Sequence, residues 1–300
     1  MNYKTSLFLW VRSRVRIARL LRGRTEARLD GDDLAFCSRA LGAALAANSY
    51  KKLAKLWLSQ SGIGDIETID IAAGLCLNVT LRRLDLSENC IGDAGAEALA
   101  EALQKNGSLR HLQLRANGVG DAGAVSIARV LQYNNSLTEL NLDGNKIGDV
   151  GAESLAAMLR LNSTLTAMWL GNNCICDCGA LAFVDVLQEN AMLTVLALAS
   201  NNIKEKYTKC KIESLLLLNA RIKCAEKQRF PTSVQLFLST MLFANSTCIS
   251  FTTRLSGCLN GDCLKLIADF AGVGYRESVK SWVEHEKTKS LTLEVCGARA

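Results

Sequence analysis

The chain has 300 residues, 49% of them hydrophobic, and a formal net charge of +6. Eight basic residues and one acidic residue fall within residues 1–28, so this segment carries +7, and the rest of the chain, with 27 basic and 28 acidic residues, carries −1. Because the basic charge is confined to the N-terminal segment, the remainder is not expected to follow a phosphate backbone, and no nucleic-acid partner is predicted.

Residues 1–28 form an arginine-rich arm with almost no acidic residues. Mitochondrial presequences have this composition, but Arg12, Arg16 and Arg19 share one face of a helical wheel while Arg14 does not. Two interpretations stay open, a disordered basic tail and a mitochondrial targeting peptide, and the pattern favours the tail. The apolar run of residues 7–11 is too short for a secretory signal, so we expect a cytoplasmic protein.

Residues 29–50 predict a cap at the N-terminal end of a repeat stack. The stretch SRALGAALAAN, from Ser38 to Asn48, resembles the helical part of the repeats that follow. The preceding LDGDD supplies a turn and a helix cap. Repeat stacks need such a terminal unit, because the end repeat would otherwise expose its apolar face.

A 28-residue pattern then returns without insertion. Its copies begin at Leu53, Leu81, Leu109, Leu137, Leu165 and Leu193. A fixed period of this length predicts one structural unit per copy, stacked on its neighbours. Each copy opens L-x-x-L-x-L, and the alternating leucines, such as Leu84 and Leu86, predict a short strand with one buried face.

The ninth position of each copy is polar and predicts a ladder of buried amides. It is occupied by Asn89, Asn117, Asn145, Asn173 and Asn201, and by a shorter serine, Ser61, in the first copy. An amide side chain carries donors and an acceptor, so it can satisfy inward-pointing backbone groups from one repeat to the next.

The segment I-G-D-x-G-A follows in the central copies and predicts the start of a helix. Gly92 is expected to allow a turn, and Asp93 is expected to cap the helix that follows it; their counterparts recur 28 and 56 residues later. The helix then has apolar residues at Ala96, Leu99 and Leu103, a spacing that predicts one buried stripe.

The repeats end near residue 222, after about six strands. The copy that starts at Leu193 lacks the G-D-x-G-A segment, and residues 223–300 do not repeat. We expect this C-terminal region to be partly helical and to cap the last repeat. Its apolar stretch Val234–Phe251 is interrupted by polar residues, so no membrane span is predicted.

The repeats resemble leucine-rich repeats of the ribonuclease-inhibitor subtype, and the N-x-I-G-D-x-G-A signature is similar to the repeat region of NOD-like receptors. The resemblance covers about residues 30–222. It implies an α/β fold, a right-handed curved leucine-rich-repeat solenoid with parallel strands inside and helices outside, over residues 29–222. It says little about function, because function depends on sites placed on a fold.

The sequence carries no catalytic or cofactor motif, so we predict neither enzyme nor cofactor. It has no nucleotide-binding G-x-x-x-x-G-K-[ST] and only two histidines, His111 and His285. Twelve cysteines in a chain without a secretory signal favour reduced thiols. The C-x-C-x-C run, Cys174, Cys176 and Cys178, falls on repeat positions and lacks a fourth ligand, so structural drift is favoured over zinc.

Positions three, five and seven of each copy are expected to project from the concave sheet, where they predict a protein-binding face. Trp and Arg are the residue types that dominate interfaces, and Trp57 and Trp169 would be the anchors. The alternative is that the charges are merely solvated and that the C-terminal region covers Trp169. The candidate residues are Trp57, Arg83, Asp85, His111, Gln113, Arg115, Glu139, Asn141, Asp143 and Trp169.

We therefore predict a monomeric interaction module or scaffold that binds a protein partner on its concave face. The partner's identity does not follow from the sequence. Ran GTPase-activating proteins are built from similar repeats, so a GTPase activator is the alternative. A ubiquitin-ligase adaptor would rest only on a short amphipathic helix at residues 261–270.

Overall fold

A computed structural model describes residues 17, 21–29, 37–48 and 50–227 of the chain. The chain divides into two compact units, Met1–Asn219 and Ala220–Ala300, and almost all described residues lie in the first. The predictions made for residues 234–251 and 261–270 fall outside the described residues. No helix in the described part is long and apolar enough to cross a membrane.

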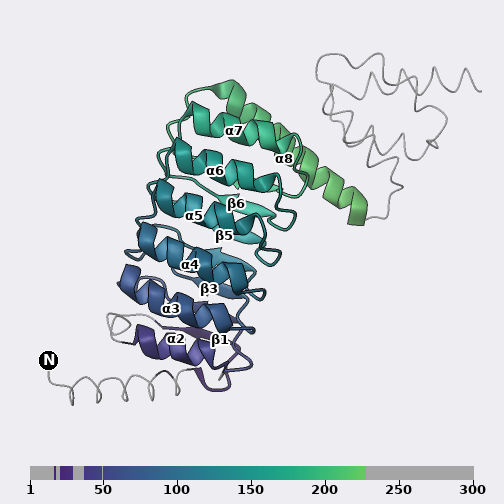
Figure 1. Cartoon of the computed structure of the whole chain (residues 1–300). Coiled ribbons are helices and arrows are strands. Elements are labelled where there is room, and N and C mark those ends of the chain that lie inside the picture. Colours follow the sequence, from purple (N-terminus) through teal and green to yellow (C-terminus); the bar gives the residue numbers. More distant parts are fainter. Residues whose placement is uncertain (1–16, 18–20, 30–36, 49, 228–300) are drawn as a thin grey trace, which may run out of the picture. The chain divides into compact units, whose positions relative to one another are not determined.

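Short strands and helices alternate along the described chain. Figure 1 shows α2 to α7 stacked side by side in chain order as one layer, and the strands form a second layer next to these helices. The elements are β1 (Glu26–Arg28), α2 (Ser38–Ala46), β2 (Lys55–Trp57), α3 (Asp65–Leu77), β3 (Arg83–Asp85), α4 (Asp93–Lys105), β4 (His111–Gln113), α5 (Asp121–Leu131), β5 (Glu139–Asn141), α6 (Asp149–Leu159), β6 (Ala167–Trp169), α7 (Asp177–Leu187), β7 (Val195–Ala197) and α8 (Lys206–Lys227).

The strands form one parallel sheet whose order is the chain order, β1 to β7. From β2 onward the register advances by one repeat per strand, so that Leu56 pairs with Leu84 and Leu84 with Leu112. Each 28-residue copy is thus one coil of strand, loop, helix and return. The predicted α/β solenoid is confirmed.

The repeated leucines form a continuous core. Leu81, Leu84 and Leu86 of one copy are fully buried, as are Leu99 and Leu103 on the helix of that copy, and the same positions are buried in the three copies that start at Leu109, Leu137 and Leu165. Burying one such side chain contributes about 1.5–3 kcal/mol, so a spine shared by successive coils stabilises each coil through its neighbours.

The sheet begins earlier than the sequence predicts. β1 lies within residues 1–28, the stretch expected to be only an arm, and the estimate of six strands is one too few for the described sheet. Ala27 faces the core in place of a leucine, which is why the L-x-x-L-x-L pattern does not reveal this strand. Backbone bonds hold it: Leu29 N donates to Trp57 O at 2.9 Å, and Ala54 N donates to Thr25 O at 2.7 Å.

The predicted asparagine ladder is confirmed. Asn145 is representative: its Nδ2 donates to the carbonyl oxygens of Leu114 and Leu142, both at 2.9 Å, and its Oδ1 accepts from Val119 N at 3.1 Å. One buried side chain therefore joins its own coil to the preceding one. Unsatisfied backbone groups in this position would each cost about 1–3 kcal/mol.

A second asparagine ladder runs where each helix returns to the next strand. Asn106 Nδ2 donates to Leu75 O at 2.7 Å and Asn78 O at 2.8 Å, and its Oδ1 accepts from the backbone of Ser108 and Leu109. The corresponding residues of neighbouring copies are also buried. The sequence signal was the N-x-[ST] ending of four successive copies, whose structural role the sequence reasoning missed.

The aspartates at the helix starts do not cap their own helices, which corrects the prediction. Asp93 is the first residue of α4, and its Oδ1 accepts from Gly120 N at 2.7 Å and Gly123 N at 2.9 Å, at the start of α5. The N-cap of α4 is Gly92. The side chain of the first helical residue thus reaches the free amides of the next coil, where the positive end of that helix also attracts it.

Gly92 was expected to allow the chain to turn, but its backbone is not in the left-handed region that favours glycine. Gly92 has φ −99° and ψ −158°, and Cys176 adopts nearly the same angles in its copy. The left-handed residue is instead at the eighth position of each copy, where φ lies between 52° and 67°. It is filled by Gln60, Glu88, Ala116, Gly144, Asn172 and Ser200.

Candidate functional site

The outward side chains of β2 to β6 and of the residues just after them form a surface that we call the sheet face. It is opposite to the buried leucines because successive side chains of a strand point to opposite sides. The strand register places Arg83 beside His111 and His111 beside Glu139 in one row. Nine of the ten predicted residues are partly or fully exposed, whereas Gln113 is only 9% exposed and offers little surface.

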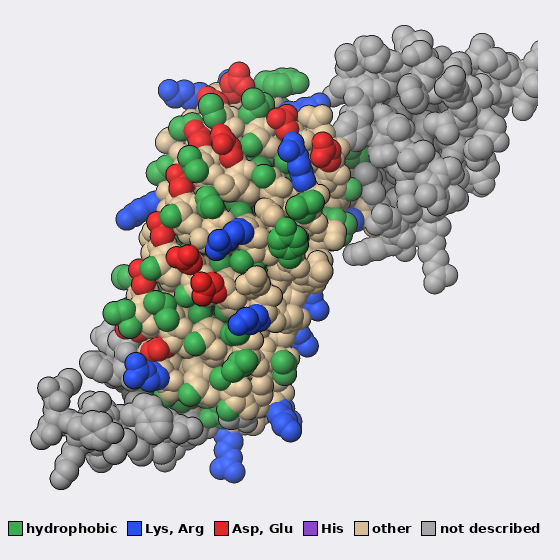
Figure 2. Space-filling view, viewed as in Figure 1, with side chains coloured by type: hydrophobic (Ala, Val, Ile, Leu, Met, Phe, Trp, Pro, Cys, Tyr) green, Lys and Arg blue, Asp and Glu red, His purple; other side chains and the backbone are tan. Residues whose placement is uncertain are grey.

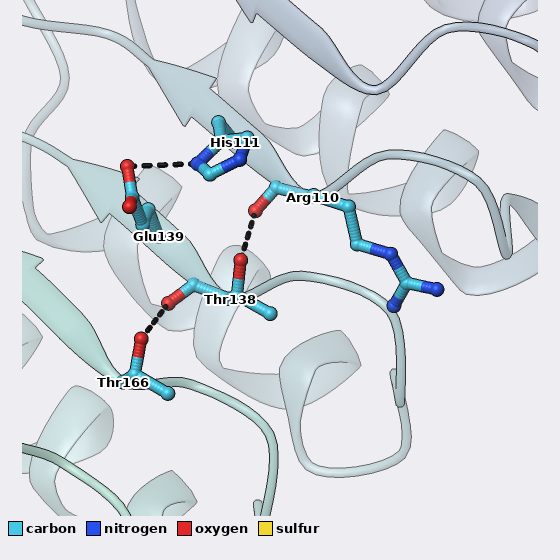
Figure 3. A network of polar contacts seen from close by, with 5 residues as sticks. All are labelled: Arg110, His111, Thr138, Glu139 and Thr166. Carbon is cyan, nitrogen blue, oxygen red and sulfur yellow. Dashed lines mark hydrogen bonds and ion pairs between the residues drawn. The ribbon is translucent and has the colours of Figure 1, made fainter.

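His111 and Glu139 are in contact at the centre of the sheet face (Figure 3). His111 Nδ1 lies 2.7 Å from Glu139 Oε2, and the two side chains are 31% and 33% exposed. The distance is that of an ion pair between the ring nitrogen and the carboxylate. The pair carries a full salt bridge only when His111 is protonated.

A threonine ladder fixes the backbone under this row, and the sequence reasoning missed it. Thr138 Oγ1 donates to Arg110 O at 3.0 Å, and Thr166 Oγ1 donates to Thr138 O at 3.1 Å (Figure 3). Thr194 repeats the contact one coil further. The signal was a threonine at the second position of three successive copies. The ladder makes the sheet face rigid, because each strand start is bound to the one before it.

The two aspartates of the sheet face already have partners in the chain. Asp85 Oδ1 accepts from Ser87 N at 3.0 Å, and Asp143 Oδ1 accepts from Gly171 N at 2.6 Å. Partial burial raises the pKa of the Asp143 carboxyl, although the Gly171 hydrogen bond and the nearby charge of Arg115 act in the opposite direction. Desolvation disfavours the charged form of a carboxyl, so burial outweighs the two favourable contacts here.

The arginines of the sheet face differ from those beside it. Arg82 Nη1 and Arg110 Nη1 each donate to the carbonyl oxygen of the residue that ends their own copy, Ser108 and Ser136, at 2.8 Å. Arg83 and Arg115, by contrast, have no hydrogen-bond acceptor or ion-pair partner among the described residues, and Arg83 Nε is buried without an acceptor. These two guanidinium groups are therefore free to bind a ligand.

The two tryptophans are too far apart to act as one anchor. Trp57 is on β2 and Trp169 on β6, both partly exposed, and four strand spacings separate them by roughly 19 Å. Trp57 lies beside Asp85 in the sheet, whereas Trp169 lies between Asn141 and Ala197. Each could contact a different part of one partner.

Small and apolar residues surround Trp169. Ala167 and Gly171 are buried beside it, and Val195 in the next strand is 41% exposed. A partly exposed aromatic ring next to exposed apolar side chains is typical of an interface. Whether the C-terminal region covers this end depends on residues outside the described part of the chain.

The cysteines provide no metal site within the described residues, where no three His, Cys, Asp or Glu side chains come close enough to hold an ion. Cys174 and Cys178 are exposed and Cys176 is partly buried. Desolvation, together with the carboxylates of Asp149 and Asp177, raises the pKa of the Cys176 thiol, which lowers its reactivity at neutral pH.

Comparisons with known proteins agree with this geometry. A family model described as "Leucine Rich repeat" matches residues 77–100, 105–128 and 133–156. The search of curated sequences found no match. The chain therefore contains leucine-rich repeats, and its fold is a leucine-rich-repeat solenoid.

Similar solved structures have low sequence identity to the chain. Leiomodin-1 actin-binding site 2 is 19% identical, with 65% of this chain and 96% of that chain covered and a TM-score of 0.43. The tropomodulin C-terminal domain of Caenorhabditis elegans is 10% identical, covering 73% and 98%, with a TM-score of 0.40. An internalin from Listeria monocytogenes is 17% identical, covering 60% and 54%, with a TM-score of 0.34.

Proposed function

We propose that the chain is a non-enzymatic interaction module that binds a partner protein through the sheet face, the concave side of a ribonuclease-inhibitor-type solenoid similar to the repeat region of NOD-like receptors. The observation that carries the proposal is the composition of a rigid surface. Trp57, Arg83 and Trp169 on strands, and Arg115 just after β4, are exposed or partly exposed, and two asparagine ladders and a threonine ladder hold these coils in place. Preorganised Trp and Arg side chains favour protein binding.

Charged and apolar residues occupy different parts of the sheet face, an arrangement that suits a protein partner. Charges of both signs occupy β3 to β5, and the surface becomes apolar around Trp169. A partner with a polar segment and an apolar segment would match both parts. No observation on the sheet face favours the GTPase-activating alternative, which depends on repeat resemblance alone; single-turnover GTP hydrolysis with candidate small GTPases would reveal it.

Affinity capture with matched variants tests the proposal. The full chain is compared with Trp169→Ala and with Tyr133→Ala, an aromatic substitution just after α5 and outside the sheet face, where Tyr133 is 76% exposed. We expect a bound protein to be depleted at least tenfold by Trp169→Ala and unchanged by Tyr133→Ala. Equal recovery with all three proteins would refute binding through this face.

We also propose that the protein is a cytoplasmic monomer. The basic segment before β1 leaves mitochondrial targeting as the alternative. A fluorescent reporter fused to residues 1–30 separates the two, because a diffuse cytosolic signal supports the first location and a mitochondrial signal supports the second. Analytical ultracentrifugation of the full chain tests the monomeric state.

A further inference from the structure

We infer that the segment of the partner that contacts β3 and β4 is acidic, and that Arg83 and Arg115 bind its carboxylates. The inference rests on the proposed function, because it names the chemistry of the partner that the sheet face would bind. It follows from a difference between the acidic and basic side chains of that face. The acidic groups have partners in the chain, whereas these two arginines have none among the described residues.

The acidic side chains of the sheet face are already engaged. Asp85 and Asp143 accept backbone hydrogen bonds, and Glu139 lies against His111. None of them forms an ion pair with Arg83 or Arg115 among the described residues, and Asp143 affects Arg115 only through its charge at a distance. A positively charged partner would meet carboxylates that already have a contact within the chain, whereas a negatively charged partner would meet two guanidinium groups that have none among the described residues.

Arg83 is the stronger indicator of a missing acceptor. Its Nε is buried without a hydrogen-bond partner, whereas the guanidinium of its neighbour Arg82 donates to Ser108 O at 2.8 Å. A buried donor without an acceptor is unfavourable, and a carboxylate is the acceptor that a guanidinium binds most strongly, through two parallel hydrogen bonds. Binding of a carboxylate would therefore satisfy a group that folding leaves unpaired.

The distance between Arg83 and Arg115 in the sheet sets the spacing expected of the acidic residues in the partner segment. Arg83 pairs with His111 in the register, and Arg115 lies four residues beyond His111 on the neighbouring coil. At about 3.3 Å per residue and about 4.8 Å between strands, the two backbone positions are roughly 14 Å apart. An extended peptide with acidic residues about four positions apart would place a carboxylate near each arginine.

Discrete carboxylates fit this surface better than a nucleic acid does. Asp85, Glu139 and Asp143 lie among the basic residues, and they would repel a continuous phosphate backbone. A peptide can place its carboxylates at the two arginines and uncharged residues over the acidic groups. Like-charge contacts would thus select against polyanions while permitting an acidic peptide.

The test is peptide selection on the full 300-residue chain, using a displayed library of random 16-residue peptides. The wild-type chain is compared with the Arg83→Gln/Arg115→Gln double variant and with Arg129→Gln, which removes an exposed arginine from α5 and serves as the matched control. Thermal unfolding confirms that all three proteins are folded. Polarisation of a labelled, selected peptide then measures affinity at low and high salt.

We expect wild type and Arg129→Gln to enrich peptides with paired Asp or Glu residues about four positions apart. The double variant should bind such a peptide at least tenfold more weakly, and Glu→Gln substitution in the peptide should have the same effect. The affinity of the wild type should fall with added salt more steeply than that of the double variant.

Three results would overturn the inference. Enriched peptides without acidic residues that fail to bind the Trp169→Ala variant of the capture experiment would contradict it but leave the proposed function standing. Selected peptides that bind independently of every sheet-face variant would contradict both. Single-stranded RNA that binds through Arg83 and Arg115 and displaces the acidic peptide would show that the partner is a nucleic acid.

Discussion

Asp93 Oδ1 accepts a hydrogen bond from Gly123 N, 2.9 Å away in the following repeat, and so ties the first residue of α4 to the first turn of α5. The same contact recurs at four other coil junctions, from Asp65 in α3 to Asp177 in α7, the last of which bonds Lys204 and Glu205 ahead of α8. Successive helix starts are therefore linked in series. The sheet face is rigid because its coils are joined on the helix side as well as in the core.

Removing one of these carboxylates should destabilise the solenoid. Asp121→Ala leaves Gly148 N and Gly151 N without their acceptor, and we expect a loss of about 1–2 kcal/mol in the free energy of unfolding. Asp185→Ala, on the exposed face of α7, is the control and should change stability by less than about 0.5 kcal/mol. Urea denaturation measures both, and equal effects would argue against the inter-repeat cap.

A methyl group at the glycine that receives this bond should also be destabilising. A Cβ on Gly123 would lie 2.8 Å from Asp93 Oδ1 and 2.9 Å from Ala96 Cβ, so Gly123→Ala should cost about 1–3 kcal/mol through overpacking. Gly107 has no atom within 4 Å of the corresponding position, and Gly107→Ala should be tolerated. A melting temperature of Gly123→Ala equal to that of Gly107→Ala would contradict the close approach.

Glycine at the eighth position of a repeat should be stabilising. Ala116 has φ 53°, a left-handed conformation that costs an ordinary residue about 1–2 kcal/mol, while glycine loses only about 0.5–1 kcal/mol of chain entropy. Ala116→Gly should therefore raise the free energy of unfolding by up to about 1 kcal/mol. The same substitution inside a helix, Ala122→Gly in α5, should lower it by a similar amount. Urea denaturation of both variants tests the prediction, which requires changes of opposite sign in the free energy of unfolding.

The raised pKa of Asp143 makes stability depend on pH in a defined direction. A carboxyl whose pKa is higher in the folded protein binds a proton more readily when folded, so its contribution to stability falls as pH rises from about 3.9, the ordinary value, through the folded pKa. Asp143→Asn keeps an oxygen for Gly171 N but does not titrate. The stability of this variant relative to wild type should therefore be greater at pH 7 than at pH 3.

Chemical denaturation at both pH values checks this prediction. Glu153→Gln on the exposed face of α6 is the control and should show a smaller change across the same range. A stability difference between Asp143→Asn and wild type that is constant, or that decreases towards pH 7, would mean that burial does not dominate the environment of Asp143.

The periodic part of the fold was predictable because identical residues recur at identical intervals. The residue types of Leu84 and Asn89 recur at the same positions in most coils, so their spacing revealed the strand, the core and the first asparagine ladder. β1 was not predictable from the pattern, since Ala27 stands where the repeats have leucine. The role of Asp93 was misassigned because a sequence shows which residue starts a helix, but not whether its side chain reaches its own coil or the next.

The candidate site was predictable only as a set of positions. The alternation of strand residues identifies the side of the sheet that Arg83 and Trp169 share, but it does not show that Gln113 is nearly buried between its neighbours. It also does not show that Asp143 is engaged with Gly171 while Arg115 has no acceptor. Those differences depend on contacts between coils, which a period alone does not contain.

The outer surface of the helices differs from the sheet face and supplies a control position for a test of partner binding. Charged side chains of both signs are spread over the side seen in Figure 2, with hydrophobic side chains between them. Tyr133 is 76% exposed and outside the sheet face, so it provides an aromatic position equivalent in chemistry to Trp169 but different in location.

Site-specific photo-crosslinking at these two positions is the most direct measurement of partner binding. Replacing Trp169 or, separately, Tyr133 with p-benzoylphenylalanine exchanges one aromatic side chain for another and should preserve the fold. Irradiation in cells should give a covalent adduct with a partner protein from position 169 and none from position 133. Adducts from position 133 alone would show that the partner does not bind the sheet face.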